Sequence, residues 1–162
     1  RWDGVPFYLR AGKRLPKRAT EIAIVFKSAP GYLFKGDMQG DDKNVLLIRI
    51  QPDEGISLKM NCKIPGINTL IQPVKMDFQY GSYFGAAPPE AYERLICDCM
   101  AGDNTLFARA DEALASWKLL TPLLNHWIEE KPKDFPNYPS GTWGPKSADA
   151  LLERDGRQWR LI

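Results

Sequence analysis

The chain has 162 residues, of which 44% are hydrophobic and 11% aromatic, and its formal net charge is +2. This length and apolar content favour one globular domain over residues 1–162 and exclude a disordered chain. The near-neutral charge argues against general affinity for nucleic acids or membranes, and no apolar run approaches the roughly 20 residues that cross a bilayer.

The first half of the chain shows period-two alternation of apolar and polar residues, which predicts strands. The predicted strands cover residues 5–10, 22–26, 44–51 and 56–62, with a last one ending at Met76, Phe78 and Tyr80. Residues 44–51 are apolar on both faces and predict a central strand, whereas 56–62 should leave one face to water. Short glycine- and proline-rich turns between them favour antiparallel pairing.

The second half changes to helical spacing. Pro88 to Glu90 open a helix that is expected to stop at Gly102. Asp111 is expected to cap another helix, which Pro122 should kink or restart. Residues 147–153 predict a short terminal helix. Strands followed by helices indicate an α+β fold, a large and mainly antiparallel sheet with helices packed on one face.

Three cysteines, Cys62, Cys97 and Cys99, have no metal-binding spacing, and no signal peptide precedes them. They indicate reduced core thiols of a cytoplasmic protein. His126, the only histidine, lies among leucines of the second predicted helix and is expected to be a structural or surface residue. Neither a metal site nor a catalytic acid–base pair is predicted. Because the chain begins at Arg1 rather than at a methionine, we expect a fragment or a processed product.

The densest positive charge comprises five cations within nine residues, around a glycine and a proline. The cations are Arg10, Lys13, Arg14, Lys17 and Arg18. Converging cations and closely approaching backbone amides can hold a phosphate, although such clusters are also common on solvated turns. On the apolar strand, Arg49 and Gln51 share one face and indicate either a polar site or a structural ion pair.

Five landmarks in order resemble the last third of glucose-6-phosphate dehydrogenases. They are RWDGVPFYLRAGK (residues 1–13), NVLLIRIQPDEG (44–55), PEAYERL (89–95), DNTLFARADE (103–112) and YPSGTWGP (138–145). The resemblance covers almost the whole chain and identifies it as a C-terminal domain of that family.

The resemblance implies oxidation of the C1 hydroxyl of glucose 6-phosphate to a lactone, with hydride transfer to NADP or sometimes NAD, at the entry of the oxidative pentose phosphate pathway. In such proteins the dinucleotide-binding domain, the catalytic histidine with its aspartate, and the main substrate-binding lysine precede the segment that resembles this chain. The resemblance therefore implies no catalytic residue here, and we expect the isolated chain to be inactive.

The resemblance also implies substrate-binding residues. Lys13 and Arg18 match two positions that reach toward the sugar phosphate, and Gln51 matches a residue near the same substrate. Arg14 and Lys17 match no such position.

Some animal relatives hold a second, structural NADP on this domain. Three positions depart from that pattern here: Ala19 and Ala23 replace cations, and Ser57 replaces an aromatic. Arg10, Arg49 and Lys59 remain. We expect the structural NADP to be absent.

The resemblance further implies a homodimer or a dimer of dimers that pairs through the sheet. Apolar residues on both faces of residues 44–51 favour the same association. The alternative is a stand-alone, non-catalytic module that retained this domain for association or regulation. The gene sequence upstream of Arg1 would separate the two.

Overall fold

The computed structural model describes residues 2–28, 43–67, 70–85, 90–130 and 133–162. These form two compact units. The first comprises Arg1–Leu15 and Pro88–Trp159, and the second comprises Pro16–Ala87 and Arg160–Ile162. The single domain expected over residues 1–162 stays a prediction.

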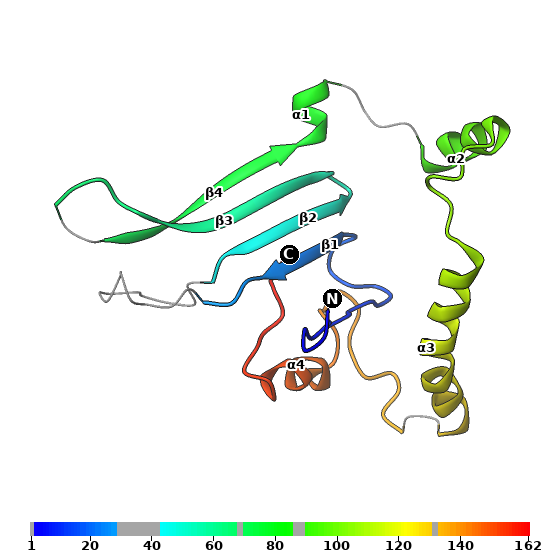
Figure 1. Cartoon of the computed structure of the whole chain (residues 1–162). Coiled ribbons are helices and arrows are strands. Elements are labelled where there is room, and N and C mark those ends of the chain that lie inside the picture. The colour runs from blue at the N-terminus through cyan, green and yellow to red at the C-terminus, as the bar shows by residue number, and fades with distance from the viewer. Residues whose placement is uncertain (1, 29–42, 68–69, 86–89, 131–132) are drawn as a thin grey trace. The chain divides into compact units, whose positions relative to one another are not determined.

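The second unit is a four-stranded antiparallel sheet in the order β1-β2-β3-β4 (Figure 1). Its strands are β1 (Thr20–Val25), β2 (Val45–Gln51), β3 (Gly55–Lys63) and β4 (Ile71–Gln79), and the short helix α1 (Tyr80–Phe84) follows β4. The antiparallel pairing and the internal position of β2 confirm the predictions from alternation and turn length.

Strand register gives the sheet two chemically different faces. Ala23, Leu47, Ser57 and Asp77 lie side by side across the four strands, and so do Ile22, Ile48, Ile56 and Phe78 on the other face. We call the first the charged face, defined by Leu47, Arg49, Ser57, Lys75 and Asp77. We call the second the apolar face, defined by Ile22, Ile24, Leu46, Ile48, Ile50, Ile56, Leu58, Met60, Val74, Met76 and Phe78.

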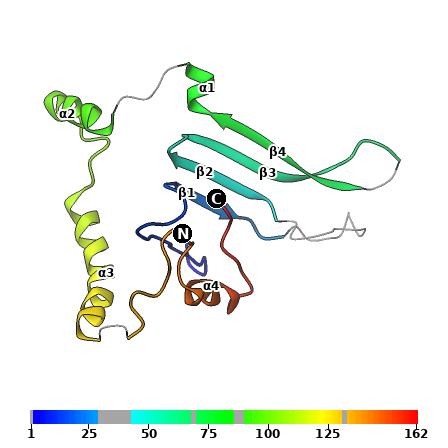
Figure 2. The same ribbon diagram turned by 180° about the vertical axis from the view of Figure 1, so that it is seen from behind.

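The first unit contains α2 (Ala91–Ala101), α3 (Ala110–Glu129) and α4 (Lys146–Glu153). α2 ends at Gly102, which confirms the predicted stop. Gly102 takes the left-handed conformation with φ of 72° and donates its N–H to the Asp98 and Cys99 carbonyls. α4 lies beside the N-terminal segment in both views (Figure 1, Figure 2). Together, sheet and helices confirm the α+β class. The packing of helices on one face of the sheet stays a prediction.

The strand predicted at residues 5–10 is wrong, because this segment joins no ladder within the described residues. Pro6 has no N–H to donate, and Tyr8 and Arg10 instead bind side chains near the C-terminal end. The segment is therefore held through its side chains rather than through its backbone.

Of the two outcomes predicted for Pro122, a restart does not occur, because α3 runs through the proline. A proline removes one hydrogen bond of a long helix, and the flanking turns offset that local cost. A kink at Pro122 stays a prediction, whereas the predicted cap is wrong. The N-cap of α3 is Arg109, and Asp111 accepts bonds from the Arg109 guanidinium at 3.0 and 2.9 Å instead of capping.

The prediction of core thiols is wrong for two of the three cysteines. Cys97 and Cys99 are exposed on α2, and only Cys62 on β3 is half-buried. Helical spacing alone therefore did not show which positions of α2 are buried.

Candidate functional site

The basic loop spans the boundary between the two units. Lys13 lies in the first unit, and Arg18 lies in the second. Both side chains are exposed, and neither forms a hydrogen bond or ion pair within the part of the chain that the structure describes. The positive charge of each side chain is therefore not neutralised by the described residues of its own unit and can contact a ligand.

The backbone around Lys13 is held by a distant part of the first unit. The Tyr138 hydroxyl donates to the Lys13 carbonyl at 2.8 Å, and the Gly141 N–H donates to the Arg14 carbonyl at 2.9 Å. Arg14 has a φ of 54°, in the left-handed region that a side chain makes unfavourable. The loop thus takes a specific conformation that these bonds support, and it is more than a freely solvated turn.

Arg10 anchors the segment that leads into this loop. Its guanidinium carbon lies 4.9 Å from the ring centre of Trp143 and 4.7 Å from that of Trp159. A cation over aromatic faces is attracted by the ring quadrupole. The Trp159 indole in turn donates to the Ala148 carbonyl at 2.8 Å, which fixes one of the two rings on α4.

Tyr8 makes the next contact along the same segment. Its hydroxyl donates to the Asp155 carboxylate and accepts a bond from Arg157 at 2.9 Å. The bond to Asp155 raises the pKa of Tyr8, with burial as a smaller cause and Arg157 opposing both. Sequence reasoning missed these contacts because their partners lie about 147 positions apart in the chain.

Gln51 lies at the end of the sheet that adjoins the basic loop in sequence. Its side-chain amide donates to the Thr20 hydroxyl at 2.8 Å, and the strand register places the two residues opposite each other. Because Arg18 precedes Thr20 by only two residues, Arg18 and Gln51 belong to the same end of the β1–β2 pair. The structure thus places two of the three predicted substrate residues at one end of the β1–β2 pair, and Lys13 belongs to the other unit.

Arg49 forms the structural ion pair that was one of its two sequence interpretations. Its guanidinium lies 2.9 Å from the Asp77 carboxylate, which also accepts bonds from Ser57 and, at 3.2 Å, from Lys75. The Ser57 hydroxyl is the largest cause of a lowered pKa at Asp77, followed among the favourable causes by Lys75 and Arg49. Sequence spacing identified Arg49 but missed Asp77, the centre of this network.

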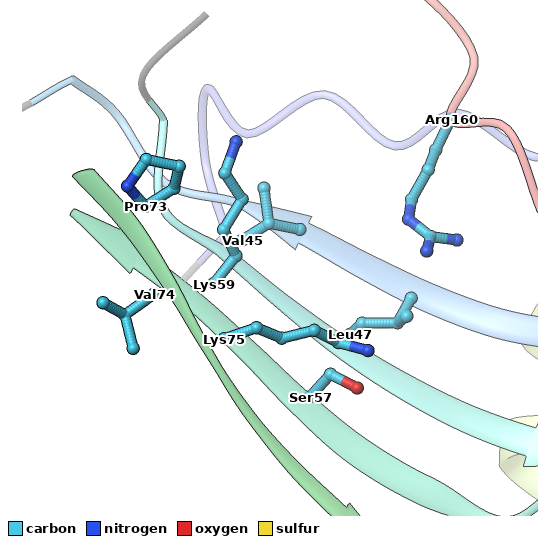
Figure 3. A pocket seen from close by; sticks show the side chains of 8 residues that line it. All are labelled: Val45, Leu47, Ser57, Lys59, Pro73, Val74, Lys75 and Arg160. Atoms are coloured by element: carbon cyan, nitrogen blue, oxygen red, sulfur yellow. The ribbon is translucent and has the colours of Figure 1, made fainter.

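A pocket of about 450 Å³ opens on the charged face (Figure 3). Its lining includes the three cations Lys59, Lys75 and Arg160 beside the apolar side chains of Val45 and Leu47. Arg160 and Lys75 each already pair with a carboxylate, at 2.6 Å with Glu21 and at 3.2 Å with Asp77. Two of the three cations that line the pocket are therefore paired with carboxylates of residues outside its lining.

His126 is exposed on α3, with its Nε2 4.0 Å from the Glu130 carboxylate. In the part of the chain that the structure describes, no three histidine, cysteine or acidic side chains gather as metal ligands would. No described helix combines the length and the apolar character needed to cross a membrane.

An antiparallel sheet, a helical unit and an exposed cationic loop define an α+β domain with a candidate anion site. The family described as "Glucose-6-phosphate dehydrogenase, C-terminal domain" matches residues 1–160, and the chain belongs to this family. This confirms the family predicted from the five sequence landmarks.

The chain is 59% identical to the glucose-6-phosphate 1-dehydrogenase of Chlamydia pneumoniae over 165 residues, covering 100% of this chain and 32% of that protein. It is 56% identical to that of Chlamydia trachomatis serovar D, covering 99% of this chain and 37% of the relative. A solved "Glucose-6-phosphate dehydrogenase in complex with its substrate glucose-6-phosphate" has a TM-score of 0.78 and 39% identity, covering 99% of this chain and 33% of the solved one. The chain thus spans about a third of the length of these relatives.

Proposed function

We propose that this chain is the C-terminal part of a glucose-6-phosphate dehydrogenase, which we call the parent dehydrogenase. This oxidoreductase would oxidise glucose 6-phosphate to 6-phosphoglucono-1,5-lactone and pass the hydride to NADP or NAD. Family membership over residues 1–160 is the observation that supports the proposal most directly. In this proposal the dinucleotide site and the catalytic base belong to a segment upstream of Arg1. A cytoplasmic location stays a prediction.

The proposed role of this chain is to hold the phosphate end of the substrate. Lys13 would neutralise the phosphate as a mobile ammonium, and Arg18 would offer a planar pair of donors. Gln51, oriented by Thr20, would hydrogen-bond near the same substrate. Binding energy gained at the phosphate, remote from C1, helps hold C1 at the correct distance for hydride transfer.

Substitution of Lys13 tests this role. In the parent dehydrogenase, Lys13→Ala and Arg18→Ala should each lower kcat/KM for glucose 6-phosphate about ten- to a hundredfold, since a charged hydrogen bond is worth on the order of 1.5–3 kcal/mol. KM for the dinucleotide should hardly change. Lys17→Ala is the matched control, because it removes a cation of the same loop that matches no substrate position. A Lys13 variant as efficient as the Lys17 control would remove Lys13 from the site.

The isolated chain is proposed to have no dehydrogenase activity. None of the cations proposed to bind substrate substitutes for a hydride acceptor site or for a base. Incubation of the purified chain with glucose 6-phosphate and NADP should produce no reduced dinucleotide by absorbance. Turnover by protein free of host enzyme would contradict the proposal.

We also propose that the domain holds no structural NADP. Two of the three residues left from that pattern are engaged by other side chains. The Arg49 guanidinium pairs with Asp77, and Ser57, which replaces the aromatic, is buried against the same carboxylate. Arg10 is likewise engaged, between Trp143 and Trp159. These contacts leave Lys59 as the remaining basic position, which is a poor match to a ligand carrying several phosphates.

A homodimer, or a dimer of dimers, is proposed to form through the apolar face of the sheet. The face exposes large apolar side chains, among them Ile22, Val74 and Met76 at 49%, 45% and 51%. A contiguous apolar surface of this kind marks an interaction site, and closed two-fold pairing is the commonest way to cover one.

A further inference from the structure

Residues near the C-terminal end hold the backbone of the basic loop at two consecutive carbonyls. The Tyr138 hydroxyl bonds the Lys13 carbonyl at 2.8 Å, and the Gly141 amide bonds the Arg14 carbonyl at 2.9 Å. A Cβ added at Gly12 would lie 3.3 Å from the Tyr138 hydroxyl oxygen, so the tyrosine also packs closely over the loop. All of these residues belong to the first unit.

The loop needs such support for two physical reasons. Arg14 is the one non-glycine residue with positive φ among the described residues, and a conformation of this kind persists only when its surroundings enforce it. The flexible four-carbon stem of lysine can aim an ammonium accurately only if its backbone is fixed. Tyr138 provides that fixed point without a charge of its own.

We infer that Tyr138 is a positioning residue for the substrate phosphate, acting through the backbone of Lys13. This inference rests on the proposed function, in which Lys13 binds that phosphate. Gly141 supports the same loop from its backbone, and Arg10, held between Trp143 and Trp159, fixes the segment leading into it. Tyr138 itself touches neither the sugar nor the dinucleotide in this assignment.

The direct test is Tyr138→Phe in the parent dehydrogenase, which removes the hydroxyl and keeps the ring. KM for glucose 6-phosphate should rise roughly two- to tenfold, the range expected for one net neutral hydrogen bond, while kcat and KM for the dinucleotide stay within twofold. Tyr83→Phe is the matched control, because it removes an exposed hydroxyl that forms no hydrogen bond within the described residues. Equal kinetics of the two variants would overturn the inference.

Two further measurements separate positioning from general loosening. Turnover of glucose, which lacks the phosphate, should be the same in the Tyr138 variant and in the unmodified enzyme. Addition of Tyr138→Phe to Lys13→Ala should cause no further loss, because the two residues act through one contact. A parallel loss with glucose, or additive effects in the double variant, would overturn the inference. If Lys13→Ala alone has no effect, the proposed function fails first and the inference falls with it.

Discussion

The two faces of the sheet differ in how they satisfy their own chemistry. On the charged face, Ser57 is 3% exposed and Leu47 5%, and the Asp77 carboxylate gathers Arg49, Lys75 and Ser57. On the apolar face, Ile56 is 40% exposed and Met76 51%. The face that alternation would assign to the core is thus the more exposed one. The exposure of a face within one chain does not show that the face stays exposed, because another chain can cover it.

The largest expected effect on folding stability is that of a substitution at Gly55, on the charged face. A Cβ there would lie 2.4 Å from the Phe78 carbonyl oxygen and 2.7 Å from a guanidinium nitrogen of Arg49. Because one of these atoms belongs to the backbone of β4, Gly55→Ala forces the strands apart and should destabilise the chain by at least about 2 kcal/mol. Thermal unfolding followed by circular dichroism should show a Tm about 4–8 °C lower.

Gly81→Ala is the control for that substitution. Gly81 lies in α1 with no atom within 4 Å of an added Cβ, so alanine there should leave the Tm equal or slightly higher. Similar Tm values for the two variants would show that the close approach of the Phe78 carbonyl and of Arg49 to Gly55 is not what requires glycine.

Alternation and turn chemistry predicted β1, β2, β3, the end of β4, the stop of α2 and the position of α4. These features depend on neighbours a few residues apart, which a single sequence displays. The segment 5–10 was assigned wrongly because a period of two records only that side chains alternate, whereas a strand also needs a backbone partner. Its true partners, Asp155, Trp143 and Trp159, lie well over a hundred positions away.

The candidate site, like the fold, could be predicted from the sequence only in part. The cations of the basic loop are visible as a cluster, but their roles came from the family resemblance. Tyr138 lies in a motif for which periodicity predicts no function. Only the folded chain shows that its hydroxyl donates a hydrogen bond to the Lys13 carbonyl. Asp77 was missed because an aspartate within an alternating strand has the spacing of an ordinary solvent-facing residue.

A charge on the apolar face should break the proposed dimer. Met76 lies in the middle of β4 opposite Leu58, and Met76→Glu would place a carboxylate in the paired surface. An unpaired buried charge costs several kcal/mol, so the dissociation constant should rise at least about a hundredfold. Light scattering of the purified chain across a dilution series measures the change in mass.

Gln72→Glu provides the comparison for that experiment. It adds the same charge near the end of the same strand, at an exposed position that is already polar, and should weaken association much less. An unmodified chain that stays monomeric at micromolar concentration would sink the proposal. A mass that rises without limit would favour aggregation of an uncovered surface over two-fold pairing.

The smallest expected effect concerns how the stability that the charged face contributes changes as the pH falls. The Ser57 hydroxyl holds the pKa of Asp77 below its ordinary value of 3.8, with Lys75 and Arg49 as further favourable causes. A carboxyl whose pKa is lower in the folded than in the unfolded chain stabilises the fold above the unfolded pKa, and this contribution disappears as the pH falls through the folded pKa. Ser57→Ala should therefore lower the free energy of unfolding at neutral pH, and the difference from the unmodified chain should shrink below about pH 4.

Urea unfolding at several pH values between 7 and 3 measures that difference, in which the contributions of carboxyls common to both proteins cancel. The same serine substitution in an Asp77→Asn background should give a difference that does not change with pH, because the titrating partner is gone. If the stability difference caused by Ser57→Ala in the chain that keeps Asp77 is equally independent of pH, the serine does not act through that carboxylate. Such a result would attribute the stability of the network on the charged face to the Arg49 pair instead.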